Sequence, residues 1–351
     1  MNMGLSTNLF TEKYFTAYQY ASRYTAEKIL EVFNLHGLFL RAASTHQRLE
    51  IIDKLKCTEA FIPSLDFALN FLVQELYIVQ DVKDADYYSR TEKTLESWID
   101  INVETNIKHS LKMIDFVADH WAYILSGKKS PIHLLFGSQG EQIWKDYFQH
   151  PSDLYYVHNQ WLALYLNPII EGGQSLLELG AGYGSGTRCI LNNLNNKKIH
   201  YTASDVSPMI VRHLGREFSH IETSVVNFDK DLFTQLNGKK YDYIVSINGL
   251  HCSFDIQDAL ARIKKCLNPG GKVILSECIR DLNHSYLHQE FIFNLLPGYK
   301  IYQNGKYFIN GFQSKLKWEN ALKETGYKNG EVILNEGDLP LGAIIVGEHH
   351  E

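Results

Sequence analysis

The stretch SLLELGAGYGSGT, from Ser175 to Thr187, decides the fold of this chain. Its first five residues are mostly apolar and predict a buried strand, and a helical pattern follows it. Between the two stand alternating glycines at Gly180, Gly182, Gly184 and Gly186. Glycine lets the backbone turn tightly and approach a ligand, and the start of the following helix offers N–H groups without partners. The stretch therefore predicts a strand–loop–helix unit that holds a nucleotide-like ligand.

The spacing of these glycines excludes two common nucleotide motifs. A dinucleotide fingerprint, G-x-G-x-x-G, would need a glycine at Ser185 or Thr187. A P-loop would end in Gly-Lys-Ser or Gly-Lys-Thr, and this loop has no such ending. The remaining pattern is E-x-G-x-G-x-G, with Glu178 at the end of the predicted strand.

Strand and helix signals alternate from about residue 150 onward. Strands are predicted at 175–179, 199–204, 223–227, 241–247, 272–277, 331–335 and 342–347. Such alternation is typical of a parallel sheet with crossover helices. We therefore predict an α/β fold, a Rossmann-like and mostly parallel sheet of seven strands preceded by a helical domain.

The first third of the chain is predicted to be helical. ASRYTAEKILEVFNLHGLF has apolar residues at helical spacing, with a start signal at Thr25 and a stop at Gly37. Two further helical stretches follow, and then two short β-prone pieces around a polar turn. Three helices ending in a hairpin form a winged-helix arrangement. Residues 97–127 are predicted to form a long connecting helix.

A winged helix often binds DNA, but its charges disfavour that function here. The predicted third helix carries Asp66 and Glu75 and almost no basic residues, whereas a DNA-binding helix must meet phosphates. We expect residues 1–130 to form a dimerisation or lid domain. Residues 131–351 are then the domain that carries the chemistry.

The glycine loop and four later stretches resemble the class I S-adenosylmethionine-dependent methyltransferases. The later stretches are, in order, IHYTASD, ETSVVNFD, YDYIVSIN and LNPGGKVILSE. Five more, HLLFGSQG, LYYVHN, INGLHCSFD, ILSECIRD and EFIFNLLPGY, are similar to the methyltransferase units of polyketide assembly lines, and together they span roughly residues 120–328. The resemblance implies the class I methyltransferase fold and S-adenosylmethionine as cofactor.

The resemblance also implies cofactor contacts at the ends of the predicted strands. Glu178 would help to hold the amino group of the methionine part, and Asp205 would accept both ribose hydroxyls. Asn227, where family members often have Asp, and Phe228 would face the adenine. The implied cofactor-binding set also includes Tyr156, Gly180, Gly182, Gly184, Val206, Asn248 and Gly249.

His251 and Glu277 follow or end neighbouring predicted strands. The carboxyl ends of adjacent parallel strands lie side by side, so these two side chains can meet. An imidazole with an unperturbed pKa of about 6.5 suits a general base, and a carboxylate can orient it. The family that the chain resembles uses such a pair at these positions. The alternative is a structural histidine with a capping or surface carboxylate.

Charge and cysteine content limit the partners. The chain has 34 Lys and Arg against 40 Asp and Glu, a net charge of −6, so nucleic acid is not expected. Its five cysteines form no C-x-x-C pair and predict reduced thiols in a cytoplasmic protein. The sequence shows neither a signal-peptide pattern nor an apolar run of about 18 residues, so no membrane association is expected. No metal site is expected, because His349 and His350 have no further ligands nearby in sequence.

Three functions follow from these features. The first is O-methylation of a polyketide-like or other secondary metabolite, with His251 as general base. The second is C-methylation between the two carbonyls of a carrier-bound β-ketothioester. We lean slightly to oxygen, because a single chain without carrier or synthase domains need not act on an assembly line. The third is a non-catalytic, cofactor-sensing regulator, which the missing basic helix disfavours. The expected partners are a small or carrier-bound acceptor and a second copy of the chain.

Overall fold

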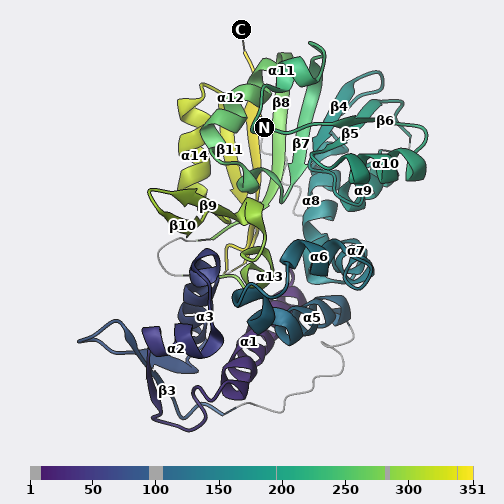
Figure 1. Cartoon of the computed structure of the whole chain (residues 1–351). Coiled ribbons are helices and arrows are strands. Elements are labelled where there is room, and N and C mark those ends of the chain that lie inside the picture. Colours follow the sequence, from purple (N-terminus) through teal and green to yellow (C-terminus); the bar gives the residue numbers. More distant parts are fainter. Residues whose placement is uncertain (1–8, 95–105, 195, 281–284, 338, 351) are drawn as a thin grey trace. The chain divides into compact units, whose positions relative to one another are not determined.

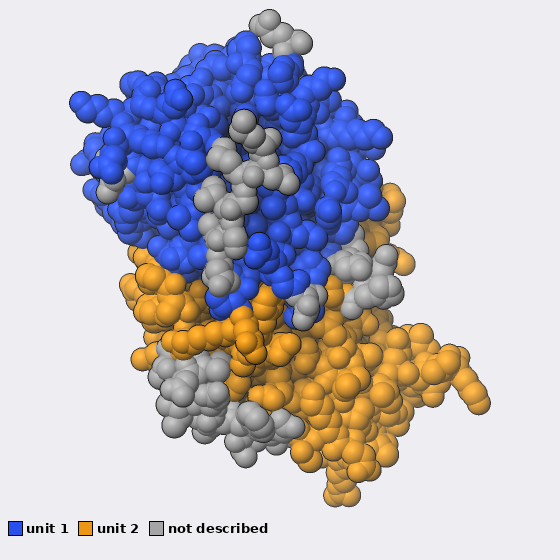
Figure 2. All heavy atoms as spheres, turned by 180° about the vertical axis from the view of Figure 1, so that it is seen from behind, with its two compact units in different colours: residues 1–11, 155–281, 312–351 blue, residues 12–154, 282–311 orange. Residues whose placement is uncertain are grey.

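The structure is a computed structural model that describes residues 9–94, 106–194, 196–280, 285–337 and 339–350. The chain divides into two compact units, which Figure 2 colours separately. We call Met1–Thr11, Tyr155–Asp281 and Phe312–Glu351 the sheet unit. We call Glu12–Leu154 and Leu282–Gly311 the helical unit.

A single seven-stranded sheet organises the sheet unit (Figure 1). The strands are β4 (Ser175–Leu179), β5 (His200–Asp205), β6 (Glu222–Val225), β7 (Tyr241–Ile247), β8 (Leu267–Cys278), β11 (Lys328–Leu334) and β12 (Gly342–Glu348). Their order is β11-β12-β8-β7-β4-β5-β6. The pairs among β4 to β8 are parallel, while β12 runs antiparallel to both β8 and β11. This confirms the predicted mostly parallel sheet of seven strands.

Helices pack on both faces of this sheet. They are α8 (Val157–Leu166), α9 (Ser185–Asn193), α10 (Pro208–Glu217), α11 (Leu232–Gln235), α12 (Ile256–Lys265) and α14 (Lys315–Glu324). Side chains of α11, α12 and α14 join Leu177 and Leu179 in one core cluster. Since successive strand residues point to opposite faces, Leu176 and Glu178 lie on the other face, where α8 and α9 pack together.

The start of the strand predicted at 272–277 needs a correction. A strand is predicted at 272–277, but β8 already begins at Leu267 and includes the Pro-Gly-Gly turn of Pro269, Gly270 and Gly271. The turn is a bulge within the strand, because the pairing with β7 shifts between Tyr241 and Tyr243. Gly270 makes this possible with a φ of +77°.

The helical unit begins with the predicted winged-helix arrangement. Its elements are α1 (Glu12–Leu35), β1 (Thr45–Gln47), α2 (Arg48–Leu55), a 3₁₀ turn (Glu59–Phe61), α3 (Ile62–Gln74), β2 (Ile78–Gln80) and β3 (Tyr87–Arg90). The strands form a small antiparallel sheet of order β1-β3-β2. On α3, Asp66 accepts two hydrogen bonds from Arg48, of 2.7 and 2.8 Å. The acid expected to repel DNA is thus neutralised within the unit.

Further helices and a hairpin complete the helical unit. They are α5 (Lys108–Leu125), α6 (Pro131–Phe136), α7 (Glu141–Gln149), α13 (Glu290–Phe293), a 3₁₀ turn (Pro297–Tyr299), β9 (Lys300–Gln303) and β10 (Lys306–Ile309). The predicted helix 97–127 is α5, and the part of that prediction at 97–105 lies outside the described residues. Across the described ranges, no helix has both the length and the apolarity that a bilayer span needs.

The predicted start of the first helix at Thr25 is wrong. The helix begins at Glu12, thirteen residues earlier, and Thr25 is buried within it. The Thr25 hydroxyl donates to the carbonyl of Ala21, one turn back, at 2.8 Å. A threonine hydroxyl can cap the start of a helix, but it can also make this bond inside one. The residue type alone therefore does not locate the start of the helix. Gly37 follows the helix with a φ of +73°, as the stop signal predicted.

The compact units also divide the chain differently from the predicted boundary at 130/131. Helices α6 and α7 belong to the helical unit, which runs on to Leu154. Asp153 ties this segment to the start of α5, where its carboxylate accepts from the backbone N–H of His109 and Ser110 at 2.9 and 3.1 Å. The indole of Trp144 packs against Phe293 in the same unit.

Candidate active site

The glycine loop follows β4 in the predicted place. Gly180, Gly182 and Gly184 have φ values of +71°, +53° and +79°, a region that side chains other than glycine rarely adopt. A Cβ atom at Gly180 or Gly182 would meet nothing within 4 Å, so the loop borders open space there. At Gly184 a Cβ would lie 2.6 Å from the Phe218 ring. The first two glycines therefore leave room for a ligand, and the third allows close packing.

Asp205 lies beside this loop at the end of β5. Its carboxylate accepts from the backbone N–H of Gly182 at 3.1 Å and of Ser207 at 2.9 Å. Burial raises the pKa of Asp205, and these backbone bonds oppose that effect. The structure thus brings the predicted ribose-binding acid next to the glycine loop. Val206, the next residue, is 60% exposed.

Glu178 is buried beneath the loop. Its Oε2 accepts from the hydroxyls of Thr187 at 2.5 Å and Tyr201 at 2.7 Å. A Cβ at Gly186 would lie 2.7 Å from the other carboxylate oxygen. Burial raises the pKa of Glu178 to about 7, against the two hydroxyl donors that lower it. Glu178 therefore links β4 to β5 and α9, and its contact with the cofactor stays a prediction.

Three other predicted cofactor residues have partners of their own. Asn227 Oδ1 accepts from the backbone N–H of Asp229 at 2.8 Å and shapes the turn after β6. Phe228 packs against the core cluster of the sheet unit. Burial raises the pKa of Tyr156 to about 12, with a hydrogen bond to Cys189 on α9 as the next cause. Tyr156 is thereby placed against the helix that follows the glycine loop.

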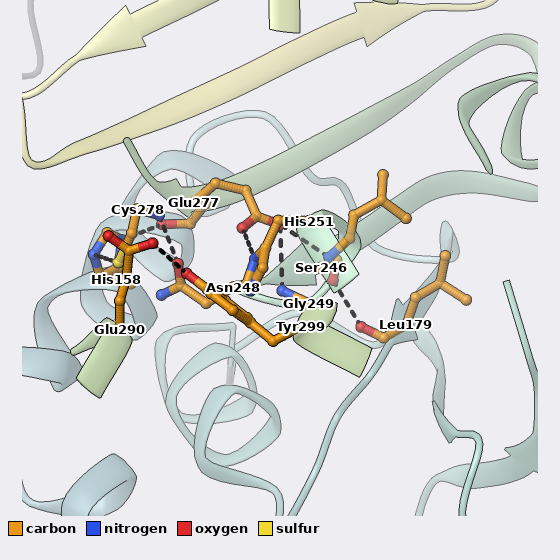
Figure 3. A network of polar contacts seen from close by, with 12 residues as sticks. His158, Leu179, Ser246, Asn248, Gly249, His251, Glu277, Cys278, Glu290 and Tyr299 are labelled. Carbon is orange, nitrogen blue, oxygen red and sulfur yellow. Dashed lines mark hydrogen bonds and ion pairs between the residues drawn. The ribbon is translucent and has the colours of Figure 1, made fainter. Parts of the chain in front are cut away.

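The predicted pair His251 and Glu277 meets at the carboxyl ends of β7 and β8 (Figure 3). His251 Nδ1 lies 2.6 Å from Glu277 Oε2, and both side chains are buried. Glu277 Oε1 accepts from the backbone N–H of Gly249 at 3.2 Å and of Leu250 at 3.0 Å. The Phe312 ring lies 4.7 Å from the imidazole ring. A surface role for Glu277 is therefore wrong, since it is fully buried.

The environment of His251 favours its charged form. Burial alone would lower the pKa of the imidazole, but Cys252 and the Glu277 carboxylate outweigh it and raise the pKa to about 10. A carboxylate can only accept, so Nδ1 carries the proton of the shared bond. Nε2 is then the ring atom that can take up a proton, and it belongs to a base stronger than free histidine.

Asn248 precedes this pair in an unusual conformation. Its φ is +45°, and its Oδ1 accepts from the backbone N–H of Cys278 at 2.6 Å. Among the described residues, its buried Nδ2 has no hydrogen-bond partner. Gly249, the other predicted cofactor residue of this turn, gives its N–H to Glu277.

Sequence reasoning missed a second polar cluster beside the pair. His158 on α8 is buried, with Nδ1 3.2 Å from Ser276 Oγ and Nε2 3.2 Å from Cys278 Sγ. The only available signal was a histidine in the apolar helix LYYVHNQWLALYL. In the described part of the chain, no three His, Cys, Asp or Glu side chains are grouped so that they could hold a metal ion.

Comparison with known proteins finds a match to one part of this arrangement. Residues 177–273, from β4 to β8, match the family model described as "Methyltransferase domain". This part of the chain is similar to a methyltransferase domain. The match confirms the predicted class of enzyme, an S-adenosylmethionine-dependent methyltransferase, and it covers the glycine loop, Asp205 and His251.

Relatives and solved structures extend the likeness to methyltransferases of polyketide synthesis. The non-reducing polyketide synthase atr1 of Stereocaulon alpinum is 26% identical over 233 residues, which are 64% of this chain and 9% of the synthase. The CurJ carbon methyltransferase superposes with a TM-score of 0.80 at 16% identity, covering 99% of this chain and 96% of that chain. The CMeT domain of the citrinin polyketide synthase reaches 0.79 at 20% identity, covering 95% and 90%. The chain thus shares its fold with the CurJ carbon methyltransferase and with the CMeT domain of the citrinin polyketide synthase.

Proposed function

We propose that the chain transfers a methyl group from S-adenosylmethionine to the carbon between the two carbonyls of a β-ketoacyl thioester. The buried His251–Glu277 pair, with 2.6 Å between Nδ1 and Oε2, is the observation that carries the proposal. Two solved proteins that share the fold over at least 95% of this chain are, by their titles, a carbon methyltransferase and a CMeT domain. This favours carbon over the oxygen acceptor to which the sequence alone leaned.

The residues around the glycine loop fit the cofactor. Gly180 and Gly182 leave open space at the end of β4, and Asp205 lies within hydrogen-bond distance of that loop. A carboxylate at this position can accept two hydroxyl groups of a ribose. When bound, S-adenosylmethionine supplies an electrophilic methyl group on a positively charged sulfur. The chain would hold this cofactor with the glycine loop and Asp205. Asn227 and Phe228 would contact its adenine.

The His251–Glu277 pair suits the removal of a carbon-bound proton. A carbon acid must ionise to an enolate before it can attack, so it needs a base of raised pKa, as His251 has. The proton would pass from the acceptor carbon to Nε2 of His251. The electron pair left on that carbon would form the new bond to methyl as the methyl–sulfur bond breaks and its electron pair stays on sulfur. Glu277 stabilises the resulting imidazolium through Nδ1, as carboxylates do in other acid–base pairs.

The acceptor and the helical unit complete the proposal. The acceptor is a free thioester or one held by a carrier protein, and the helical unit covers it or pairs with a second copy. Light scattering of the full chain checks the pairing. A regulator without activity is not favoured, because α3 carries no Lys or Arg that could meet DNA phosphates.

The test is an assay with labelled S-adenosylmethionine and matched acceptors. We would offer acetoacetyl thioesters, both free and carrier-bound, next to phenols and aliphatic alcohols. Carbon-13 NMR of the product separates C-methyl from O-methyl signals. C-methylated thioester supports the proposal, while methyl on a phenol or alcohol alone would establish the oxygen alternative. Binding of cofactor without transfer to any acceptor would support the regulator.

A further inference from the structure

Hydrogen bonds join a four-residue turn, which contains the proposed base, to the last three residues of a neighbouring strand. The turn is 248–251, after β7, and the strand end is 276–278, the close of β8. Asn248 N–H donates to the carbonyl of Ser276 at 2.8 Å, and Asn248 Oδ1 accepts from Cys278 N–H at 2.6 Å. Glu277 lies between these two contacts and binds the rest of the turn with its carboxylate. Asn248 therefore fixes the backbone on both sides of Glu277.

The opposite face of the same strand end is held by His158 (Figure 3). Successive residues of a strand point to opposite faces, so Glu277 points toward His251 while Ser276 and Cys278 point toward α8. There His158 Nδ1 meets Ser276 Oγ and Nε2 meets Cys278 Sγ, each at 3.2 Å. Cys278 is thus held twice, through its backbone by Asn248 and through its thiol by His158.

The charge state of His158 fits this arrangement. Burial, and next the charge of His251, lower the pKa of His158 to about 3, so the ring is neutral near pH 7. A neutral imidazole donates with one nitrogen and accepts with the other, which suits one hydroxyl and one thiol. It can therefore satisfy both neighbours without placing a second positive charge beside the proposed base.

We propose that Asn248 and His158 are positioning residues that act through Cys278 to hold Glu277 in line with His251. The inference rests on the proposed role of His251 as base. It gives Asn248 a task other than the cofactor contact that the family resemblance implies. A small displacement of such a carboxylate is costly, because misplacing a catalytic group by about 1 Å can lower a rate roughly 10²-fold.

Asn248→Gly tests the inference cleanly. Glycine adopts a positive φ without strain, so the variant removes only the side chain. Asn237→Gly is the matched control, because Asn237 is exposed in the same unit with a φ of +53°. The first readout is the titration of the His251 ring by NMR of the protein without acceptor. Besides Glu277, the groups that influence this titration are Cys252 and His158.

Three measurements compare these variants. In Asn248→Gly the His251 titration moves toward 6.5, the cofactor dissociation constant stays within about twofold, and methyl transfer falls roughly 10- to 100-fold. Asn237→Gly leaves all three unchanged. Asn248→Asp keeps the accepting oxygen but lacks the amide N–H, and it restores most of the lost rate. His158→Phe shifts the titration in the same direction, and its effect is less than additive with Asn248→Gly because both act through Cys278.

Two results would overturn the inference. An unchanged His251 titration in Asn248→Gly would show that Glu277 needs no such support. Cofactor affinity that falls in parallel with the rate, with no rescue by Asp, would make Asn248 a ligand contact instead. The proposed function fails separately, if the parent chain methylates no carbon acceptor, and the NMR titration is read independently of that outcome.

Discussion

Glu277 binds His251 with one carboxylate oxygen. Its other carboxylate oxygen accepts hydrogen bonds from the two backbone N–H groups that precede His251 in the same turn. The first contact is 2.6 Å long, from Oε2 to Nδ1, and the others are 3.2 and 3.0 Å, from Gly249 and Leu250. The carboxylate therefore stays in place even when the imidazole is absent. Variants of the two residues consequently report on chemistry rather than on the collapse of the turn.

The first prediction concerns the base. His251→Ala should lower methyl transfer by a factor of about 10²–10⁴, since a positioned general base contributes that much. Cofactor affinity by calorimetry should not change. Parent-like turnover in His251→Ala would show that the proton leaves by another route.

The second prediction concerns the pH profile of the same reaction. Only neutral His251 can take a proton, and its pKa is raised, so the parent rate should still rise between pH 7 and 9. In Glu277→Gln the imidazolium loses its carboxylate, the pKa falls toward 6.5 and the profile should level off earlier, at a lower maximum. Initial rates against pH check this, and identical profiles for both proteins would refute it.

The third prediction concerns Asp205. Asp205→Ala should weaken S-adenosylmethionine binding at least tenfold, because hydrogen bonds to a charged group contribute about 1.5–3 kcal/mol each. Asp255→Ala is the control, since Asp255 also accepts a backbone N–H, from Asp258 at 2.9 Å, at the start of α12. Asp255→Ala should destabilise the fold without weakening the binding of S-adenosylmethionine. Equal affinity of Asp205→Ala and the parent would remove Asp205 from the site.

The fourth prediction compares two strained glycines. Gly180 and Gly173 have φ values of +71° and +87°, and a Cβ at either would meet nothing within 4 Å. Alanine at either position should therefore destabilise the fold by a similar amount, about 1–2 kcal/mol for a left-handed residue. Only Gly180→Ala should also weaken cofactor binding, because its methyl enters the open space that the glycine loop borders. The same cofactor affinity in both variants would place the ligand elsewhere.

The fifth prediction concerns the buried Glu178. Its pKa is raised to about 7, so the folded chain keeps the proton while the unfolded chain releases it near 4.5. The parent therefore has an additional free energy of unfolding relative to Glu178→Gln. This difference is fully present below pH 4.5 and is lost as the pH rises toward 7. The difference should reach about 3 kcal/mol, from 1.36 kcal/mol per unit of pKa. Urea unfolding at pH 4.5, 6 and 7.5 measures it, and a constant difference would contradict the raised pKa.

The sequence by itself was sufficient for the sheet and for the pair at its edge. The buried strands were short apolar runs between clear breaks, so 175–179 and 241–247 were predicted with the bounds of β4 and β7. A parallel sheet brings the carboxyl ends of its strands to one edge, which is why His251 and Glu277 could be paired across 26 residues. These conclusions depend on local pattern and on one rule of sheet geometry.

Only the tertiary structure decided how the site is supported and where the units divide. That Asp153 caps α5 and extends the helical unit to Leu154 depends on a contact across more than 40 residues, which no local pattern encodes. The contacts of His158 with Cys278 and of Asn248 with the same residue are likewise long-range. The raised pKa of His251 comes from burial and neighbouring groups together, and both exist only once the chain has folded around them.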